Sequence, residues 1–444
     1  MSKVVIIGNG ISGVTAARHI RKNSDKEILI ISAETEHFYS RTALMYVFMG
    51  HMRYEDIKPY EDWFWEKNRI DLMFDYVSHV DTDNKMLEMK SGENVTYDAL
   101  IIATGSKSNK FGWPGEDLNG VQGLYSYQDL QLLENNSRDT KRAVIVGGGL
   151  IGVEMAEMLA TRKIDVTVLV REDVFWGNVL PKEEGEMISK HIRDDHHIDL
   201  RLNAELEEII DNGNGRVKAV KTKDGEVIDC QLVGLTAGVS PNVEFLKTSK
   251  LEIDRGVVVN EFFETNIPDV YAIGDCAQFK ETVNGRKNIE QVWYTGRIMG
   301  ETVAQTICGN KMSYNPGPWF NSAKFFDIEY QTYGWVFNEL KENQADYYWE
   351  HEKEKICLHL IWNKNTDEFI GINTFGIRLR HDLFDKWLKE KASIETVMTE
   401  LRNANFDPEF YSHYEKDIVQ GFNDSTGKEI RLKPQKWWRK LISA

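Results

Sequence analysis

The stretch Val4-Val5-Ile6-Ile7-Gly8-Asn9-Gly10-Ile11-Ser12-Gly13 places four apolar residues directly before three closely spaced glycines. A run with helical character, Val14–Ile20, follows it. Glycines at this spacing allow a tight turn, bring a pyrophosphate close to backbone amides, and let the helix pack closely on the strand. The phosphates then face a helix N-terminus, where unpaired N–H groups and the helix dipole favour negative charge. The stretch therefore predicts a strand–turn–helix unit that binds a dinucleotide.

An acidic residue follows the next predicted strand. The strand Glu27-Ile28-Leu29-Ile30-Ile31 is followed by Glu34, which lies about 20 residues past the glycines, where a carboxylate can accept hydrogen bonds from ribose hydroxyls. A single glycine turn also serves ordinary loops. Glu34 therefore favours the dinucleotide interpretation over a purely structural turn.

The same pattern returns further along the chain. The strand Arg142–Val146 runs into Gly147-Gly148-Gly149-Leu150-Ile151-Gly152, and a helix is expected from Val153 to Ala160. A repeat of a whole supersecondary unit is far more specific than one motif. The sequence therefore predicts two Rossmann-like nucleotide-binding folds in one chain.

The end of the next strand leaves the choice of nicotinamide open. The strand Val166–Val170 is followed by Arg171, and an arginine at this place suits the 2′-phosphate of NADPH. Glu172 and Asp173 come next and could accept a 2′-hydroxyl instead. Both NADH and NADPH remain open.

Several other segments end in small or polar residues, as ligand-facing strand ends do. They are Ala103-Thr104-Gly105, the turn through Gly238, and the strand that ends in Gly274-Asp275. The Asp275 carboxylate could bond a sugar or ribityl hydroxyl, or it could be an exposed turn residue. Arg41 is a candidate phosphate or flavin contact, with an ordinary loop arginine as the alternative.

Composition limits the classes of protein. The chain has 444 residues, 41% of them hydrophobic, and a net charge of −16. No apolar run approaches the roughly 18 residues of a membrane-spanning helix, and Met1-Ser2-Lys3 leaves no room for a signal peptide before the first strand. A cytoplasmic protein is expected. The acidic balance argues against nucleic-acid binding, which needs clustered cations.

The C-terminal tail departs from this balance. Its cations and apolar residues suit a membrane surface or an acidic partner. Packing on the protein's own acidic surface is an equally good explanation. The residues are Lys428, Arg431, Lys433, Lys436, Trp437, Trp438, Arg439, Lys440, Leu441 and Ile442.

The four cysteines, Cys230, Cys276, Cys308 and Cys357, form no CxxC motif and no cluster with histidines. Zinc and iron–sulfur sites need closely spaced ligands. The sequence therefore predicts no metal centre and four ordinary reduced cysteines.

Taken in order, the motifs resemble the FAD- and NAD(P)-dependent pyridine nucleotide-disulfide reductase superfamily, in particular the branch with rubredoxin and ferredoxin reductases, the FAD subunit of nitrite reductases and apoptosis-inducing factor. The resemblance covers about three-quarters of the chain and implies an α/β, glutathione-reductase-like fold. The matching segments are Gly8–Gly13, Ala103–Gly105, Gly147–Gly152 with Glu154, Ala237–Asn242 and Thr265–Asp275.

The resemblance also implies domains. An FAD-binding domain would comprise residues 1–112 and 247–310, an NAD(P)-binding domain residues 113–246, and a small α+β domain residues 311–444. In that last region we expect strands over 347–360 and 368–374 and a helix over 382–391.

The resemblance further implies which residues hold the cofactors. Glu34 would take the FAD ribose, the backbone of Val77 the adenine, and Asp275 the ribityl chain. A helix beginning near Gln291 would point its N-terminus at the flavin, and Glu154 would lie beside the nicotinamide. The cofactor-binding set is Gly8, Gly10, Ile11, Ser12, Gly13, Glu34, Arg41, Val77, Ala103, Thr104, Gly105, Gly147, Gly149, Leu150, Ile151, Gly152, Arg171, Gly238, Asp275, Gln291 and Val292; Trp319 and Phe320 would lie near the isoalloxazine.

The departures from the family pattern bear on function. Thr42 and Ala43 stand where disulfide reductases carry a redox cysteine, Tyr46 stands near an expected lysine partner of Glu154, and Asn321 replaces a tryptophan. Disulfide exchange needs a reactive thiolate, so thiol chemistry is not expected.

We therefore expect an enzyme that passes electrons from NAD(P)H through FAD to an external acceptor. A small carrier such as rubredoxin or ferredoxin is the first choice, and a quinone or oxygen is the second. A redox sensor that acts by binding partners and a subunit of a larger reductase are further hypotheses. A monomer and a homodimer are both compatible with the sequence.

Overall fold

The computed structural model describes residues 2–282, 285–406 and 412–434. The chain divides into two compact units. The first unit comprises Met1–Gly147, Met155–Thr167 and Glu205–Pro316, and the second comprises Gly148–Glu154, Val168–Ala204 and Gly317–Ala444. The predicted boundaries of three domains stay a prediction.

The first unit contains a parallel five-stranded sheet built on the N-terminal strand. The strand order is β19-β7-β1-β2-β3, and Val4 pairs with Ile28 on one side and Ala99 on the other. Strands buried on both faces need continuous apolar runs, which explains the sequence Val4–Ile7. The strands are β1 (Lys3–Ile7), β2 (Glu27–Ser32), β3 (Asp71–Phe74), β7 (Ala99–Ile102) and β19 (Val270–Ala272).

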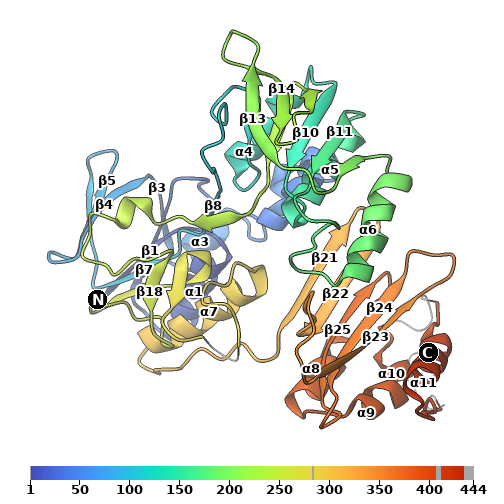
Figure 1. Cartoon of the computed structure of the whole chain (residues 1–444). Coiled ribbons are helices and arrows are strands. Elements are labelled where there is room, and N and C mark those ends of the chain that lie inside the picture. The colour runs from blue at the N-terminus through green and yellow to red at the C-terminus, as the bar shows by residue number, and fades with distance from the viewer. Residues whose placement is uncertain (1, 283–284, 407–411, 435–444) are drawn as a thin grey trace. The chain divides into compact units, whose positions relative to one another are not determined.

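Two helices, α1 (Ile11–Asn23) and α7 (Trp293–Ile307), lie against each other in this unit (Figure 1). Small residues allow the close approach. A Cβ atom at Gly300 would lie 2.5 Å from the backbone oxygen of Ser12. The helix that was expected near Gln291 thus begins at Trp293, with Val292 as its N-cap.

The first unit also contains antiparallel sheets and further helices and strands. A three-stranded antiparallel sheet has the order β4-β5-β6, and another has the order β13-β14-β15. The elements are α2 (Leu44–Phe48), α3 (Trp63–Lys67), β4 (Val77–Asp81), β5 (Met86–Met89), β6 (Asn94–Thr96), β8 (Ser106–Ser108), α4 (Tyr127–Ser137), β13 (Leu206–Asp211), β14 (Val217–Thr222), β15 (Val227–Asp229), β17 (Val239–Pro241), β18 (Val257–Val259) and β20 (Ala277–Phe279). Short 3-10 helices lie at Arg41–Ala43 (η1), Tyr54–Ile57 (η2), Glu244–Leu246 (η3) and Gly274–Cys276 (η4).

The second glycine turn follows β10 (Arg142–Val146), which pairs in parallel with β16 (Leu232–Leu235). The strand β16 pairs in turn with β9 (Val121–Gln122). The division between the two units passes through α5 (Leu150–Thr161) and β11 (Asp165–Leu169).

The second unit is an antiparallel sheet with helices on it (Figure 1). The strand order is β21-β22-β25-β24-β23. The strand expected over 347–360 is two strands, β23 and β24, and the other two expectations hold within a few residues. The elements are α6 (Lys182–Asp194), β12 (Asp199–Arg201), β21 (Phe320–Phe325), β22 (Ile328–Gly334), β23 (Gln344–Glu350), β24 (Cys357–Asn363), β25 (Phe369–Phe375), α8 (His381–Lys389), α9 (Ile394–Thr399), α10 (Leu401–Ala404) and α11 (Glu415–Thr426).

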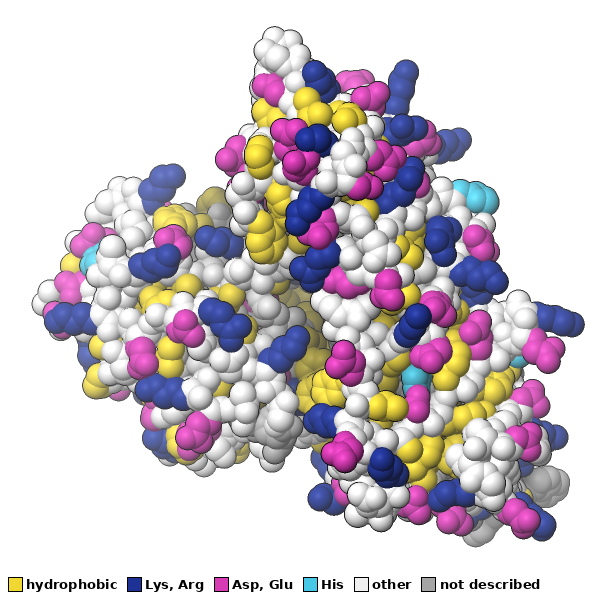
Figure 2. All heavy atoms as spheres, viewed as in Figure 1, with side chains coloured by type: hydrophobic (Ala, Val, Ile, Leu, Met, Phe, Trp, Pro, Cys, Tyr) yellow, Lys and Arg dark blue, Asp and Glu magenta, His cyan; other side chains and the backbone are white. Residues whose placement is uncertain are grey.

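In the part of the chain that the structure describes, no helix is long and apolar enough to cross a membrane. On the face shown in Figure 2, cationic and anionic side chains are interspersed.

Candidate functional site

The glycines of the first turn differ in why glycine is needed, since two allow close packing and one leaves open space. A Cβ atom at Gly8, whose φ is +110°, would lie 2.2 Å from the carbonyl oxygen of Ala103, and one at Gly13 would lie 2.1 Å from the oxygen of Gly8. These two glycines are therefore required by packing. At Gly10, by contrast, a Cβ atom would meet nothing within 4 Å. Gly10 thus presents bare backbone to open space, as a bound phosphate would require.

The N-terminus of α1 carries no side-chain cap, and its N-cap residue is Gly10. Ile11 and Ser12 open the helix, and Cβ atoms at Gly274 and Gly296 would lie 2.5 and 2.7 Å from the Ser12 hydroxyl oxygen. The structure therefore brings the first glycine turn next to the Gly274-Asp275 strand end, over 260 positions later in the chain. Uncapped N–H groups at a helix start are the donors that bind phosphate.

Asp275 lies in a polar cluster beside this turn. Its Oδ2 accepts hydrogen bonds from the hydroxyls of Ser106 at 3.0 Å and Tyr125 at 3.3 Å. Gln291 donates from Nε2 to the Ser106 hydroxyl at 2.8 Å. Burial raises the pKa of Asp275, and the two hydroxyl donors oppose that shift. The predicted residues Asp275 and Gln291 therefore meet at Ser106, the first residue of β8.

Glu34 and Arg41 form a two-pronged ion pair. The Arg41 guanidinium donates from Nη2 to Oε2 at 2.6 Å and from Nη1 to Oε1 at 2.9 Å. The Tyr39 hydroxyl and the Tyr127 backbone N–H, the latter at 2.9 Å, also donate to Glu34 Oε1. Although burial favours the neutral acid, the Arg41 charge and these donors hold the pKa of Glu34 below its usual value. The carboxylate predicted to bind ribose is ionised and already oriented.

Tyr125 connects this ion pair to Asp275, and sequence analysis did not find it. Its backbone carbonyl accepts from Arg41 Nη1 at 2.5 Å, and the guanidinium lies 4.5 Å from its ring centroid. Its hydroxyl reaches Asp275, and a Cβ atom at Gly105 would lie 2.9 Å from that hydroxyl oxygen. The residue has no motif to reveal it, because its role depends on contacts between positions far apart in the chain.

Other predicted residues lie at the ends of elements in the first unit. Thr104 donates through its hydroxyl to the Asn242 carbonyl at 2.8 Å, and Val77 is buried at the start of β4. A Cβ atom added at Gly147 (φ +128°) would lie 2.7 Å from the Thr236 carbonyl. Gly238 has a φ of +90°, a backbone conformation that favours glycine.

The rest of the second turn belongs to the second unit. A Cβ atom at Gly148 would lie 2.7 Å from the Val170 side chain, whereas one at Gly149 would meet only Trp176, at 3.9 Å. Leu150, Ile151, Gly152 and Glu154 form the first turns of α5. Arg171 is 71% exposed and pairs with Glu172 at 2.9 Å, so a neighbouring carboxylate engages the charge that was expected to face a 2′-phosphate.

Two other predicted residues of the second unit lie at the start of β21. Trp319 stacks on Trp335, with ring centroids 5.3 Å apart. Phe320 packs on His381 at 4.4 Å. Their predicted place near the isoalloxazine stays a prediction.

All four cysteines are free thiols, and three of them are buried. Burial raises the pKa of Cys230 to about 12 and also raises the pKa values of Cys276 and Cys357. Thr42 and Ala43 lie in η1 directly after Arg41. None of the three buried cysteines has the low pKa that a reactive thiolate needs.

Comparison with known proteins identifies relatives of this fold. The family model described as pyridine nucleotide-disulphide oxidoreductase matches residues 2–300. A nitrite reductase [NAD(P)H] from Bacillus subtilis is 29% identical over 84% of the chain, which spans only 45% of that protein. An NADH oxidase from Methanocaldococcus jannaschii is 32% identical, covering 74% of the chain and 75% of the relative. An NADH-rubredoxin oxidoreductase from Clostridium acetobutylicum is 29% identical, covering 71% and 76%.

Among solved structures, an NAD-dependent persulfide reductase from A. fulgidus aligns with a TM-score of 0.83 at 22% identity. The alignment covers 98% of this chain and 86% of that one. This likeness confirms the predicted α/β, glutathione-reductase-like fold.

Proposed function

Because the chain belongs to the pyridine nucleotide-disulphide oxidoreductase family, we propose that it carries electrons from NAD(P)H through FAD to an external acceptor, first of all a small redox protein of the rubredoxin or ferredoxin type. Membership confirms the resemblance seen in the ordered motifs, and FAD and NAD(P)H are the cofactor and co-substrate that go with it. FAD supplies the redox chemistry, since it accepts a hydride and can release electrons one at a time.

The state of the cysteines carries this proposal. A family member that reduces disulfides needs a reactive thiolate, but Cys276 is fully buried, and burial raises its pKa. Threonine and alanine occupy positions 42 and 43. Without a thiol relay, electrons must leave from the flavin to an acceptor outside the chain.

The residues of the first unit have the donors and acceptors that FAD requires. The uncapped start of α1 at Gly10 would bind the pyrophosphate, the ionised Glu34 would accept from the ribose, and Asp275 would accept from the ribityl chain. Arg41 holds Glu34 in place. The N-terminus of α7, whose N-cap is Val292 and which has no side-chain cap, would stabilise negative charge on the ring.

In the second unit, Glu154 and the residues that open α5 would orient the nicotinamide. We retain the three-domain division at residues 112, 246 and 310 as the functional arrangement, with residues 113–246 holding NAD(P)H. The Arg171–Glu172 pair supports either nicotinamide, because the arginine could turn to a 2′-phosphate and the glutamate could accept a 2′-hydroxyl.

The acceptor is tested by steady-state turnover of NADH and NADPH against rubredoxin, ferredoxin, a quinone, oxygen and a low-molecular-weight disulfide. Fast reduction of a carrier protein, with no reduction of the disulfide, is the expected result. Fast turnover with oxygen alone would favour the activity named for the M. jannaschii relative. In anaerobic stopped-flow mixing, flavin reduction that takes many minutes would instead indicate a sensor that acts by binding partners.

A second candidate is an electron-delivering part of a larger reductase. The alignments with the nitrite reductase and with an assimilatory nitrate reductase electron transfer subunit cover 84% and 88% of this chain but only 45% and 49% of those proteins. Gel filtration of native extract distinguishes the two. Co-elution with an iron–sulfur or siroheme protein would support the second candidate over a free-standing enzyme.

The role of the basic tail stays a proposal with two alternatives, which are packing on the protein's own surface and contact with a membrane or an acidic partner. Lys428 pairs with Asp367 at 3.3 Å and Lys433 with Glu400 at 2.6 Å, which favours packing on the protein's own acidic surface. The predicted segment from Lys436 to Ile442 lies outside the described residues. Flotation with anionic vesicles tests membrane contact, and sedimentation separates monomer from homodimer. Cell fractionation tests the expected cytoplasmic location.

A further inference from the structure

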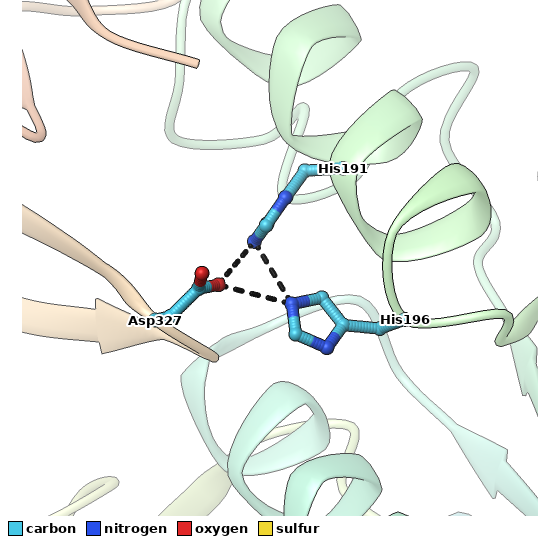
Figure 3. Close-up of side chains that lie close together, drawn as sticks. All are labelled: His191, His196 and Asp327. Carbon is cyan, nitrogen blue, oxygen red and sulfur yellow. Dashed lines mark hydrogen bonds and ion pairs between the residues drawn. The ribbon is translucent and has the colours of Figure 1, made fainter. Parts of the chain in front are cut away.

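Two histidines and an aspartate converge in the second unit (Figure 3). His191 Nε2 and His196 Nε2 lie 2.9 and 3.0 Å from Asp327 Oδ1, and the two nitrogens are 3.1 Å apart. His191 comes from the end of α6, His196 from the segment just after it, and Asp327 from the turn between β21 and β22. Three potential ligand atoms thus form a nearly equilateral triangle.

His191 has a carboxylate behind it, as many metal-binding histidines do. Its Nδ1 lies 2.7 Å from Asp195 Oδ2, a carboxylate that also pairs with Lys355. In the neutral ring, a proton on Nδ1 satisfies Asp195 and leaves a lone pair on Nε2 directed at the other two residues. A carboxylate behind a histidine fixes the tautomer and ring orientation of metal-bound histidines in the same way.

The turn that carries Asp327 is also held toward the histidines. Phe326 adopts a left-handed backbone conformation, with φ of 55°, which is unusual for a bulky residue. Its ring stacks on His196 with centroids 4.0 Å apart and an angle of 18° between planes. The stack positions His196 and directs the next residue, Asp327, at both nitrogens. His191 is 3% exposed, whereas Asp327 is 75% exposed, so the open side faces solvent.

We propose that His191, His196 and Asp327 bind one divalent first-row transition metal ion, with Zn²⁺ as the reference ion. An ion about 2.1 Å from each atom would lie about 1.2 Å off the plane of a triangle with edges of 2.9 to 3.1 Å. The angles between its bonds would then be about 90°. Two imidazoles and one carboxylate on one face of an ion are a familiar ligand set, and water would complete the coordination from the solvent side.

The site would join two elements that lie far apart in the sequence. The end of α6 and the β21–β22 turn are separated by more than 130 residues between His191 and Asp327. An ion bound to both would stabilise the second unit. The bound ion would then have a structural role, and this proposal does not depend on the flavin chemistry proposed above.

Metal binding is measured on the complete flavoprotein after treatment with a chelator, by titration with Zn²⁺ in a calorimeter. One ion per chain is expected in the wild type. Asp327→Asn and His196→Ala should weaken that binding at least 100-fold, and Asp195→Asn should weaken it about 10- to 100-fold, as loss of a partner behind a ligand does. The matched control is His197→Asn, because His197 is an exposed neighbour with a φ of 54° that asparagine tolerates.

Zn K-edge X-ray absorption on the same protein provides a second readout that the flavin does not disturb. The wild type should show scattering from two imidazoles, and Zn²⁺ should raise its unfolding temperature but not that of Asp327→Asn. Asp327 is largely exposed, so this variant should fold. Binding by Asp327→Asn and His196→Ala as tight as in the wild type, or no stoichiometric binding in the wild type, would overturn the proposal and leave the cluster as hydrogen-bonded side chains only.

Discussion

The first glycine turn allows protein stability and flavin binding to be separated by two neighbouring substitutions. At Gly8, an added Cβ atom would lie 2.2 Å from the Ala103 carbonyl oxygen at a φ of +110°. At Gly10, it would meet no atom within 4 Å. Gly8→Ala should therefore damage the fold, whereas Gly10→Ala should damage only what binds in the open space.

The magnitudes follow from these distances. For Gly8→Ala, unfavourable backbone geometry costs about 1–3 kcal/mol and the clash with fixed backbone costs about 1–3 kcal/mol more. Gly10→Ala should change the free energy of unfolding by less than about 1 kcal/mol, because a small loss at the N-cap is offset by a less flexible unfolded chain. A methyl group between Gly10 and a phosphate would break one or two charge-assisted hydrogen bonds of about 1.5–3 kcal/mol each. FAD affinity should fall at least tenfold.

The assay uses flavin-free protein. Urea unfolding gives the free energy of unfolding, and quenching of flavin fluorescence on reconstitution gives the Kd for FAD. Gly50→Ala is the matched control, since its added Cβ atom also meets nothing within 4 Å, although its φ of +78° adds some strain. If Gly10→Ala bound FAD as tightly as the wild type, the pyrophosphate would not lie at this turn, and the proposed cofactor site would be wrong.

Three further outcomes are expected. Tyr125→Phe removes the hydrogen bond to Asp275 but keeps the ring on Arg41. A loss near 1 kcal/mol should lower FAD affinity about fivefold. Flavin fluorescence measures this affinity, and the control Tyr127→Phe should leave it unchanged. N-ethylmaleimide should leave NAD(P)H turnover unchanged, because burial suppresses three of the four thiolates and the fourth cysteine, Cys308, lies at the C-terminal end of α7, at the opposite end of the helix from Gln291. A loss of turnover would support thiol chemistry. Burial lowers the pKa of His359, but the carboxylates of Asp346 and Glu184 outweigh it and raise the pKa to about 9. The stabilising charge of His359 is therefore fully present below pH 6.5 and is lost as the pH rises toward 9. The free energy of unfolding measured in urea should therefore fall over that pH range, and His359→Asn should remove this pH dependence.

The parts of the fold that sequence predicted best are the ones built from local signals. The run Val4–Ile7 followed by glycines specifies a buried parallel strand and the turn after it, and the structure has both. Strand boundaries are harder to predict where pairing with another strand decides them. The expected single strand over 347–360 is interrupted at 351–356, because hydrogen bonds between β23 and β24 turn it into a hairpin.

The candidate site was predicted as a set of separate contacts, but the structure shows a connected network. Glu34 and Asp275 were each expected to face a sugar, and each is held by side chains of its own unit. The connection runs through Arg41 and Tyr125. A tyrosine in a loop carries no signal in a single sequence, since its role arises only when two distant strand ends meet.

The histidine cluster shows why a search for closely spaced ligands fails in this chain. His191 and His196 are five positions apart, and five residues of continuous helix would turn their side chains about 140° away from each other. They converge because α6 ends at Asp194 and the chain then leaves the helix, reaching a left-handed residue at His197. The third ligand, Asp327, comes from a hairpin turn more than 130 residues away. Its position depends on the stack of Phe326 on His196, so replacing Phe326 by alanine should loosen metal binding without removing any ligand atom.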